Sequence, residues 1–201
     1  MRTEPGVEPI SIDVGHVLRR SAESLYSHLV TRPTGRAVRR AIEEQVAGSS
    51  RTALSSIDLS DVTVMDFSCA DEIVAKLLMR FLEKDRPVDA LFVFRGVCEN
   101  LHEPMQAVLE RQELLAVTQG SDGCCELMGT RTEEEEYVWT VLEGRGRIEA
   151  AEVAEVFPGS HHREALDELV LRRVAFSPPG GHVYRALSTL VEETSLEEGS
   201  A

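Results

Sequence analysis

The sequence predicts an α/β fold followed by a smaller domain of helices and a hairpin. Strand patterns alternate with helical patterns up to about residue 129, which is typical of helices packed on a sheet. The charged run TRTEEEE (130–136) then interrupts the apolar pattern, and three helical patterns precede a Pro- and Gly-rich hairpin. We therefore expect an α/β domain over 1–128, a second domain over 129–190 and a loose acidic tail over 191–201.

Several segments of the first domain carry strand patterns. In PISIDVG (9–15) every second residue is apolar, which predicts a half-buried strand. DALFVFRGV (89–97) is apolar almost throughout, so we expect it to be buried on both faces. The other expected strands are TALSSIDL (52–59), which runs into the apolar stretch VTVM, and two short strands around a Gly-Ser-Asp-Gly turn within 114–129.

Helices are expected between these strands, each with a capping residue. Thr34 is the expected N-cap of the first helix. Ser68 and Asp71 form the pattern of a capping box for the second, in which each side chain bonds the other's backbone N–H. Asn100 and Glu103 give the same pattern for the third.

The second domain has the pattern of a winged helix. Helical periodicity is present around 137–142 and at 150–157, and Ser160 is placed to cap a third helix. VAFSPPGGHVYRAL (174–187) then reads as a strand, a tip and a returning strand. Three short helices and a hairpin are the elements of winged-helix domains.

The composition limits the classes of function. The net charge of −14 opposes general attraction to nucleic acid or anionic lipid. No apolar run reaches the roughly 18 residues of a membrane helix, and the first residues lack the apolar core of a secretion signal, so we expect a cytoplasmic protein. The four cysteines lack metal-ligand spacing, and no catalytic constellation is present; we expect no metal, no cofactor and no enzymatic activity.

A family resemblance comes from SSIDLSDVTVMDFSCADEIVAKLL (55–78). This stretch resembles the central motif of STAS domains, the fold of anti-sigma-factor antagonists, in the STAS-like form whose helix begins Ser-x-Ala-Asp-Glu. LVTRPTGRAVRRAIE (29–43) fits the same family, and the resemblance covers about residues 8–128. It implies a mixed sheet with packed helices and a surface that docks a histidine-kinase-like ATPase or a sigma-pathway protein.

The resemblance also bears on phosphorylation. In the antagonists, the Ser directly after Met-Asp is phosphorylated by the partner kinase; the resemblance places Phe67 at that position, and Phe cannot accept phosphate. Ser68 is the alternative acceptor, but a phosphate there would lie near Asp66, Asp71 and Glu72, and like charges repel. We therefore expect Ser68 to act as a cap rather than as a switch.

The loop and helix from Asp66 to Arg80 are the expected docking surface. Glu72, Lys76 and Arg80 are spaced four residues apart, so they share one helix face. That face is either a solvated ladder of ion pairs or the docking stripe, and the two interpretations are compatible. The expected docking residues are Asp66, Ser68, Asp71, Glu72, Lys76 and Arg80.

A basic cluster precedes this motif. It consists of Arg32, Arg36, Arg39 and Arg40. Arg39–Glu43 and Arg40–Glu44 pairs would neutralise much of it and give a solvated face. The alternative interpretation is a site for an anion or an acidic partner.

We therefore expect a regulatory adaptor whose STAS-like domain docks a protein partner. The second domain would add another contact or form a homodimer. The alternative is a transcription regulator that binds DNA through the third helix of the winged helix, with Arg163, Arg172 and Arg173 on phosphate. Seven basic against fifteen acidic residues from Arg131 to Ala201 disfavour that alternative.

Overall fold

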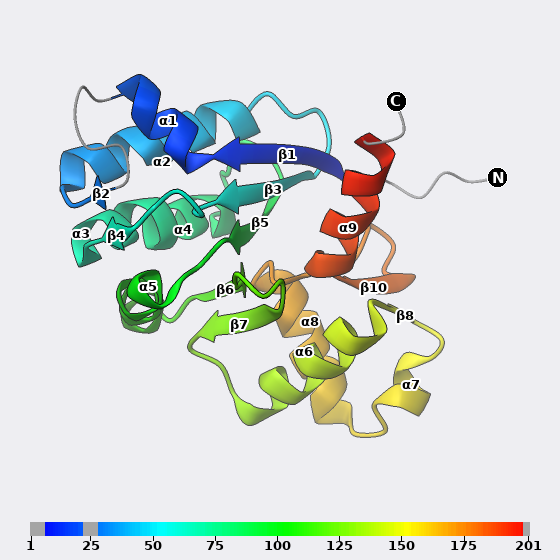
Figure 1. The fold of residues 1–201 in the computed structure, drawn as a ribbon. Helices are drawn as coiled ribbons and strands as arrows, with labels where there is room; N and C mark the ends of the chain where they lie inside the picture. Colours follow the sequence, from blue (N-terminus) through cyan, green and yellow to red (C-terminus); the bar gives the residue numbers. More distant parts are fainter. Residues whose placement is uncertain (1–6, 22–27, 199–201) are drawn as a thin grey trace.

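The structure, a computed structural model, describes residues 7–21 and 28–198. A five-stranded sheet in the order β1-β3-β5-β6-β7 forms its centre (Figure 1). The first four strands are parallel, and β7 runs antiparallel to β6. The strands are β1 (Glu8–Asp13), β3 (Ala53–Asp58), β5 (Ala90–Arg95), β6 (Leu115–Gln119) and β7 (Cys125–Gly129). A mixed sheet with packed helices confirms the predicted α/β class.

Helices from the first two thirds of the chain cover one face of this sheet (Figure 1). They are α1 (Val14–Ser21), α2 (Arg32–Val46), a continuous helix made of α3 (Phe67–Ala70), the π-helical segment η1 (Asp71–Lys76) and α4 (Leu77–Leu82), and α5 (Glu99–Arg111). Two short parallel strands, β2 (His28–Leu29) and β4 (Val64–Met65), pair beyond the carboxyl ends of β1 and β3. We call this pair the ribbon.

The C-terminal part of the chain covers the opposite face. It contains a three-stranded antiparallel sheet in the order β8-β10-β9. Its elements are α6 (Glu133–Arg145), β8 (Arg147–Glu149), α7 (Val153–Val156), α8 (Ser160–Leu171), β9 (Ala175–Phe176), β10 (Val183–Ala186) and α9 (Leu187–Glu198). We call residues 130–198 the C-terminal module.

The central sheet separates two apolar cores. Along β5, Phe92 and Phe94 face the first core, whereas Leu91 and Val93 face the second. This alternation confirms that β5 is buried on both faces. The second core exists only because the C-terminal module lies on the sheet, so the module completes the fold of the first domain.

Helices α2 and α5 begin earlier than predicted. The N-cap of α2 is Thr31, whose side chain accepts from the backbone N–H of Thr34, so the prediction of Thr34 as the cap is wrong. The physical reason is Pro33, whose fixed backbone angle suits the first helical turn. Helix α5 begins at Glu99 after Cys98, which makes no capping side-chain bond, so the expected capping box at Asn100 is also wrong.

The largest correction concerns the acidic tail. Residues 191–198, predicted to be loose, belong to α9. Leu187, Leu190 and Val191 are buried in the second core, which holds this helix on the sheet despite its acidic composition. The helix expected at 150–157 is limited to Val153–Val156, and β8, which pairs with β10, was not predicted.

Candidate functional site

The helix after the ribbon starts at Phe67, with Asp66 as its cap. The Asp66 carboxylate accepts from the backbone N–H of Cys69 at 2.8 Å and from the Ser68 hydroxyl at 2.9 Å. Burial alone would raise the pKa of Asp66, but the bonds from Cys69 and Ser68 outweigh burial and lower the pKa. The predicted Ser68–Asp71 capping box is therefore wrong, because the helix begins before Ser68 and places Asp66 at the N-cap.

Asp71 and Glu72 do not lie on the surface. Their exposed fractions are 5% and 0%, which contradicts the expectation that Glu72 is on a solvated face. Helix α2 crosses the continuous helix here and covers both residues. The crossing is close at Gly35, where an added Cβ would lie 3.0 Å from the Cα of Cys69 and 3.2 Å from the Cβ of Glu72.

Cationic side chains surround these two buried carboxylates. Glu72 lies 2.5 Å from Lys76 Nζ and 3.0 Å from Arg32 Nη1. Asp71 lies 2.7 Å from Arg32 Nη1 and 2.8 Å from Arg111 Nη2. The full set of cationic neighbours is Arg32, Arg36, Arg39, Lys76 and Arg111. We call these residues and the two carboxylates the charge cluster.

The charge cluster keeps both carboxylates ionised. Burial alone would raise the pKa of Asp71 and of Glu72, but hydrogen bonds and charges from Arg32 and Lys76 outweigh burial and lower both pKa values. A carboxylate with a lowered pKa is a poor general acid or base near neutral pH. The cluster therefore joins α2 and α5 to η1 and does not resemble a catalytic site.

The cluster nevertheless exposes positive charge. The exposed fractions of the side chains are 43% for Arg32, 51% for Arg36 and 63% for Arg111. Arg39 is more buried and forms the predicted ion pair with Glu43 at 2.5 Å, which is confirmed. Arg111 was not singled out from the sequence, because it lies 40 residues from Asp71 along the chain.

Three exposed apolar side chains lie at the end of the molecule where α2 and α3 begin. Leu29 and Met65 point into the core, so Val30 and Val64 point outward from the ribbon, with exposed fractions of 49% and 42%. Phe67, the first residue of α3, is 53% exposed. Figure 1 shows the ribbon and the starts of α2 and α3 at the same end of the molecule. We call Val30, Val64, Phe67, Arg32, Arg36 and Arg111 the ribbon surface.

Glu72, Lys76 and Arg80, the predicted docking stripe, do not form one continuous surface in the structure. Lys76 contacts Glu72 as expected, so its ammonium is engaged in the charge cluster. Arg80 instead contacts Glu83 at 2.9 Å and Asp85 at 3.4 Å, both just after the C-terminal end of α4. Arg40 is exposed on α2.

The arginines expected to contact DNA have a structural role. Arg172 Nη1 lies 2.8 Å from Glu135 Oε1, and its other terminal nitrogen donates to the carbonyl oxygens of Glu113 and Thr130. Arg173 bonds Asp89 and the carbonyl oxygen of Ala90, next to β5. Both therefore hold the end of α8 against the central sheet, and of the three candidates only Arg163 is exposed.

Metal sites, membrane-spanning helices and activated cysteines are the other features to consider among the described residues. Within 7–21 and 28–198, no group of three His, Cys, Asp or Glu side chains is placed to hold a metal ion. None of the helices in these ranges is long and apolar enough to span a membrane. Burial, followed by the charge of Asp66, raises the pKa of the Cys69 thiol to about 12, so this cysteine is not an activated nucleophile.

Comparison of the chain with protein-family models, with curated proteins and with solved structures gave no match.

Proposed function

We propose that this chain is a non-enzymatic regulatory adaptor that docks a protein partner through the ribbon surface. The observation that carries the proposal is Phe67, an aromatic side chain that is 53% exposed at the first position of α3. The start of α3 contacts the start of α2, where Arg32 lies, through the hydrogen bond from Cys69 to the carbonyl oxygen of Thr31. Aromatic residues and Arg are the residue types enriched at the energetic centres of protein interfaces.

Charge favours an acidic contact region on the partner. The chain carries a net charge of −14, whereas the ribbon surface presents three partly exposed arginines. Opposite charges steer the encounter, and repulsion elsewhere disfavours wrong orientations. Because Asp71 and Glu72 are already paired, the partner would contact the outer nitrogens of the guanidinium groups.

The resemblance to STAS-like domains suggests the class of partner, a histidine-kinase-like ATPase or a sigma-pathway protein. Phe67 occupies the position of the phosphoacceptor in that resemblance, which favours a permanent apolar contact over a covalent switch. Ser68 is not well placed for phosphorylation, since its hydroxyl is bonded to the Asp66 carboxylate. The C-terminal module would add a second contact or mediate a homodimer.

A pull-down from native cells with quantitative mass spectrometry tests the proposal. Wild type and two substituted chains serve as bait: Phe67→Ser on the ribbon surface and Leu171→Ser on α8, where the exposed fraction is 71%. We expect a specific partner to be retained by wild type and by Leu171→Ser and to be lost by Phe67→Ser. Equal retention by both variants would contradict the proposal.

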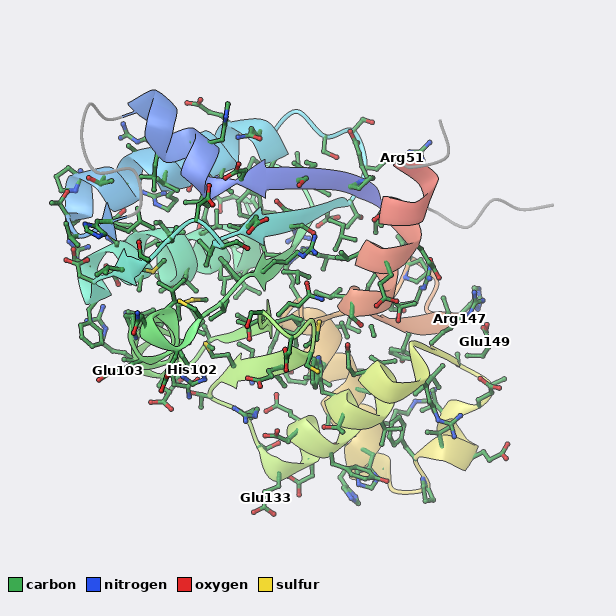
Figure 2. The ribbon with its side chains drawn as sticks, viewed as in Figure 1. Arg51, His102, Glu103, Glu133, Arg147 and Glu149 are labelled. Atoms are coloured by element: carbon green, nitrogen blue, oxygen red, sulfur yellow. The ribbon has the colours of Figure 1, made fainter. Side chains whose placement is uncertain are left out.

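A second pair of variants separates specific contacts from general charge. Arg36→Gln removes a cation from the ribbon surface, and Arg51→Gln removes one near the other end of the sheet (Figure 2). Both changes alter the net charge equally. We expect Arg36→Gln to weaken binding of the retained partner at least about tenfold and Arg51→Gln to leave it nearly unchanged.

The alternative, a DNA-binding regulator, is favoured by one observation. The order α6-β8-α7-α8-β9-β10, with strand order β8-β10-β9, is the order of elements expected of a winged helix. However, Arg172 is bonded to Glu113 and Arg173 to Asp89 in the first domain, and the exposed side of α8 carries Glu164, Asp167 and Glu168. Titration with duplex DNA at several salt concentrations tests it; binding that weakens steeply with salt would support DNA recognition.

A further inference from the structure

A cavity lies between the central sheet and α9. Its volume is about 570 Å³, within the range of about 300–1,000 Å³ of small-molecule sites. It is lined from both parts of the molecule, by Val93, Arg95, Gln119 and Cys125 on the sheet and by Val191 and Glu192 on α9. The walls therefore combine apolar side chains with groups of opposite charge.

The cationic wall of the cavity is held in place by a hydrogen bond. Arg95 Nε donates to Gln119 Oε1 at 2.8 Å, which orients the guanidinium at the ends of β5 and β6. Within the described part of the chain, no carboxylate lies within 4.0 Å of Arg95, since none of the ion pairs there includes it. The two terminal nitrogens can therefore bind a carboxylate from a ligand in bidentate fashion.

The opposite wall carries an acidic group. Glu192 lines the cavity, whereas Glu143 lies near Glu192 but is not part of the lining. Burial raises the pKa of Glu143, and the charge of Glu192 raises it further. Oε2 of Glu143 is buried and has no hydrogen-bond partner among the described residues. The raised pKa favours the neutral, protonated form of Glu143, so Glu192 is the carboxylate that this wall offers to a ligand.

We infer that this cavity binds a small amino-carboxylate with an apolar side chain. Its carboxylate would pair with Arg95, its ammonium would face Glu192, and its apolar part would lie on Val93 and Val191. The opposite charges in the cavity wall select a zwitterion, because an anion would be repelled by Glu192 and a cation by Arg95.

Occupancy of the cavity would link the two parts of the chain. Val93 and Arg95 belong to β5, whereas Val191 and Glu192 belong to α9, which follows directly on β10 of the C-terminal module. A ligand that contacts both walls binds the assembled form better than any form in which α9 has left the sheet. The ligand therefore stabilises the packed C-terminal module by mass action.

Isothermal titration of the full chain tests this inference with three probes of matched shape. L-phenylalanine carries both charges, 3-phenylpropanoate only the carboxylate, and 2-phenylethylamine only the ammonium. We expect saturable binding of L-phenylalanine at millimolar or lower concentration and at least about tenfold weaker binding of each half-probe. Arg95→Gln and Glu192→Gln should each weaken L-phenylalanine binding by a similar factor.

Glu193→Gln is the matched control, since Glu193 is the next residue of α9 and pairs with Arg185 instead. It should leave binding unchanged, and circular dichroism should show that all three variants are folded. Equal binding of 3-phenylpropanoate would reduce the site to an anion site, and equal binding of 2-phenylethylamine to a cation site; either result overturns the inference. So does the absence of saturable binding of L-phenylalanine up to about 10 mM.

Discussion

Glu72 combines complete burial with a negative charge, and its neighbours explain how the fold tolerates both. Removing a carboxylate from water costs several kcal/mol unless opposite charges and hydrogen bonds compensate. Lys76, Arg32 and Arg39 lie within 3.3 Å of its two oxygens. Their charged groups are themselves partly exposed, which limits the desolvation cost of the whole cluster.

Substitution of Glu72 should therefore destabilise the protein in a pH-dependent way. We expect Glu72→Gln to lower the free energy of unfolding at pH 7 by about 2 kcal/mol, below the roughly 3–5 kcal/mol of a fully buried pair. Because the pKa of Glu72 is lowered in the folded state, its contribution is present above the ordinary value of 4.5 and is lost as the pH falls below it. As the pH falls below 4.5, the free energy of unfolding should consequently decrease less for Glu72→Gln than for wild type.

Urea unfolding of both proteins at pH 7 and at several pH values below 5 measures this difference. Glu83→Gln is the control, since Glu83 forms an exposed pair with Arg80. Exposed pairs contribute about 0–1 kcal/mol, so this variant should stay close to wild type. Equal losses for the two variants at pH 7 would show that the charge cluster does not stabilise the fold.

The start of α3 gives a second prediction, because Asp66 is the N-cap in place of Ser68, and the Ser68 hydroxyl donates to Asp66. Asp66→Ala removes the N-cap and should cost about 1 kcal/mol, whereas Asp66→Asn keeps an acceptor and should cost less. Ser68→Asp should destabilise the protein, because it places a carboxylate beside Asp66. Thermal unfolding of the variants measures these differences; a neutral Ser68→Asp would contradict the geometry described for Asp66.

Among the elements, those with a strong intrinsic pattern were predictable. Strand β5 is apolar at nearly every position, and only burial on two faces explains such a run. Strand β8 has three residues and exists because β10 pairs with it, so no local pattern could reveal it. Helix α9 did carry a signal, Leu187, Leu190 and Val191 at helical spacing, which the surrounding glutamates obscured.

The candidate site was predictable in position and not in detail. Helical periodicity alone places Glu72 outside the apolar face that contains Ile73 and Leu77, which predicts that Glu72 is exposed to solvent. The sequence contains no direct sign that α2 crosses there, although Gly35 is the residue that permits the close approach. Arg111 and Val30 join the site only through tertiary packing. The docking segment was therefore located from its motif, while its exposed residues required the structure.

The packing of α9 on the sheet predicts how much a substitution in this helix lowers the free energy of unfolding. Leu190 is 3% exposed in the second core, so Leu190→Ala should lower the free energy of unfolding by about 3 kcal/mol. Leu171→Ala removes the same atoms from a side chain that is 71% exposed and should cost less than about 0.5 kcal/mol. Chemical denaturation measures both; equal, small effects would mean that α9 does not hold the sheet in solution.

At the scale of the whole molecule, the two parts of the chain are joined by one shared core. Leu54, Leu91 and Leu115 of the central sheet belong to the same apolar cluster as Trp139 and Leu166 of the C-terminal module. Without the module, one face of the sheet would expose this apolar surface to water. The bonds of Arg172 to Glu113 and of Arg173 to Asp89 add polar contacts between the module and the first domain. The boundary near residue 129 thus separates two patterns of sequence that fold as one unit.

This shared core predicts a single cooperative unfolding transition. Trp139, the one tryptophan of the chain, is 6% exposed in the second core and reports on the C-terminal module. Far-ultraviolet circular dichroism reports on the helices of both the first domain and the C-terminal module. We expect the fluorescence and dichroism curves in urea to coincide, because neither part can keep its core when the other unfolds. A fluorescence transition at lower urea than the dichroism transition would instead show that the C-terminal module detaches and unfolds first. In that case the sheet would keep its other helices, and the module would be an independent attachment rather than the cover of a core.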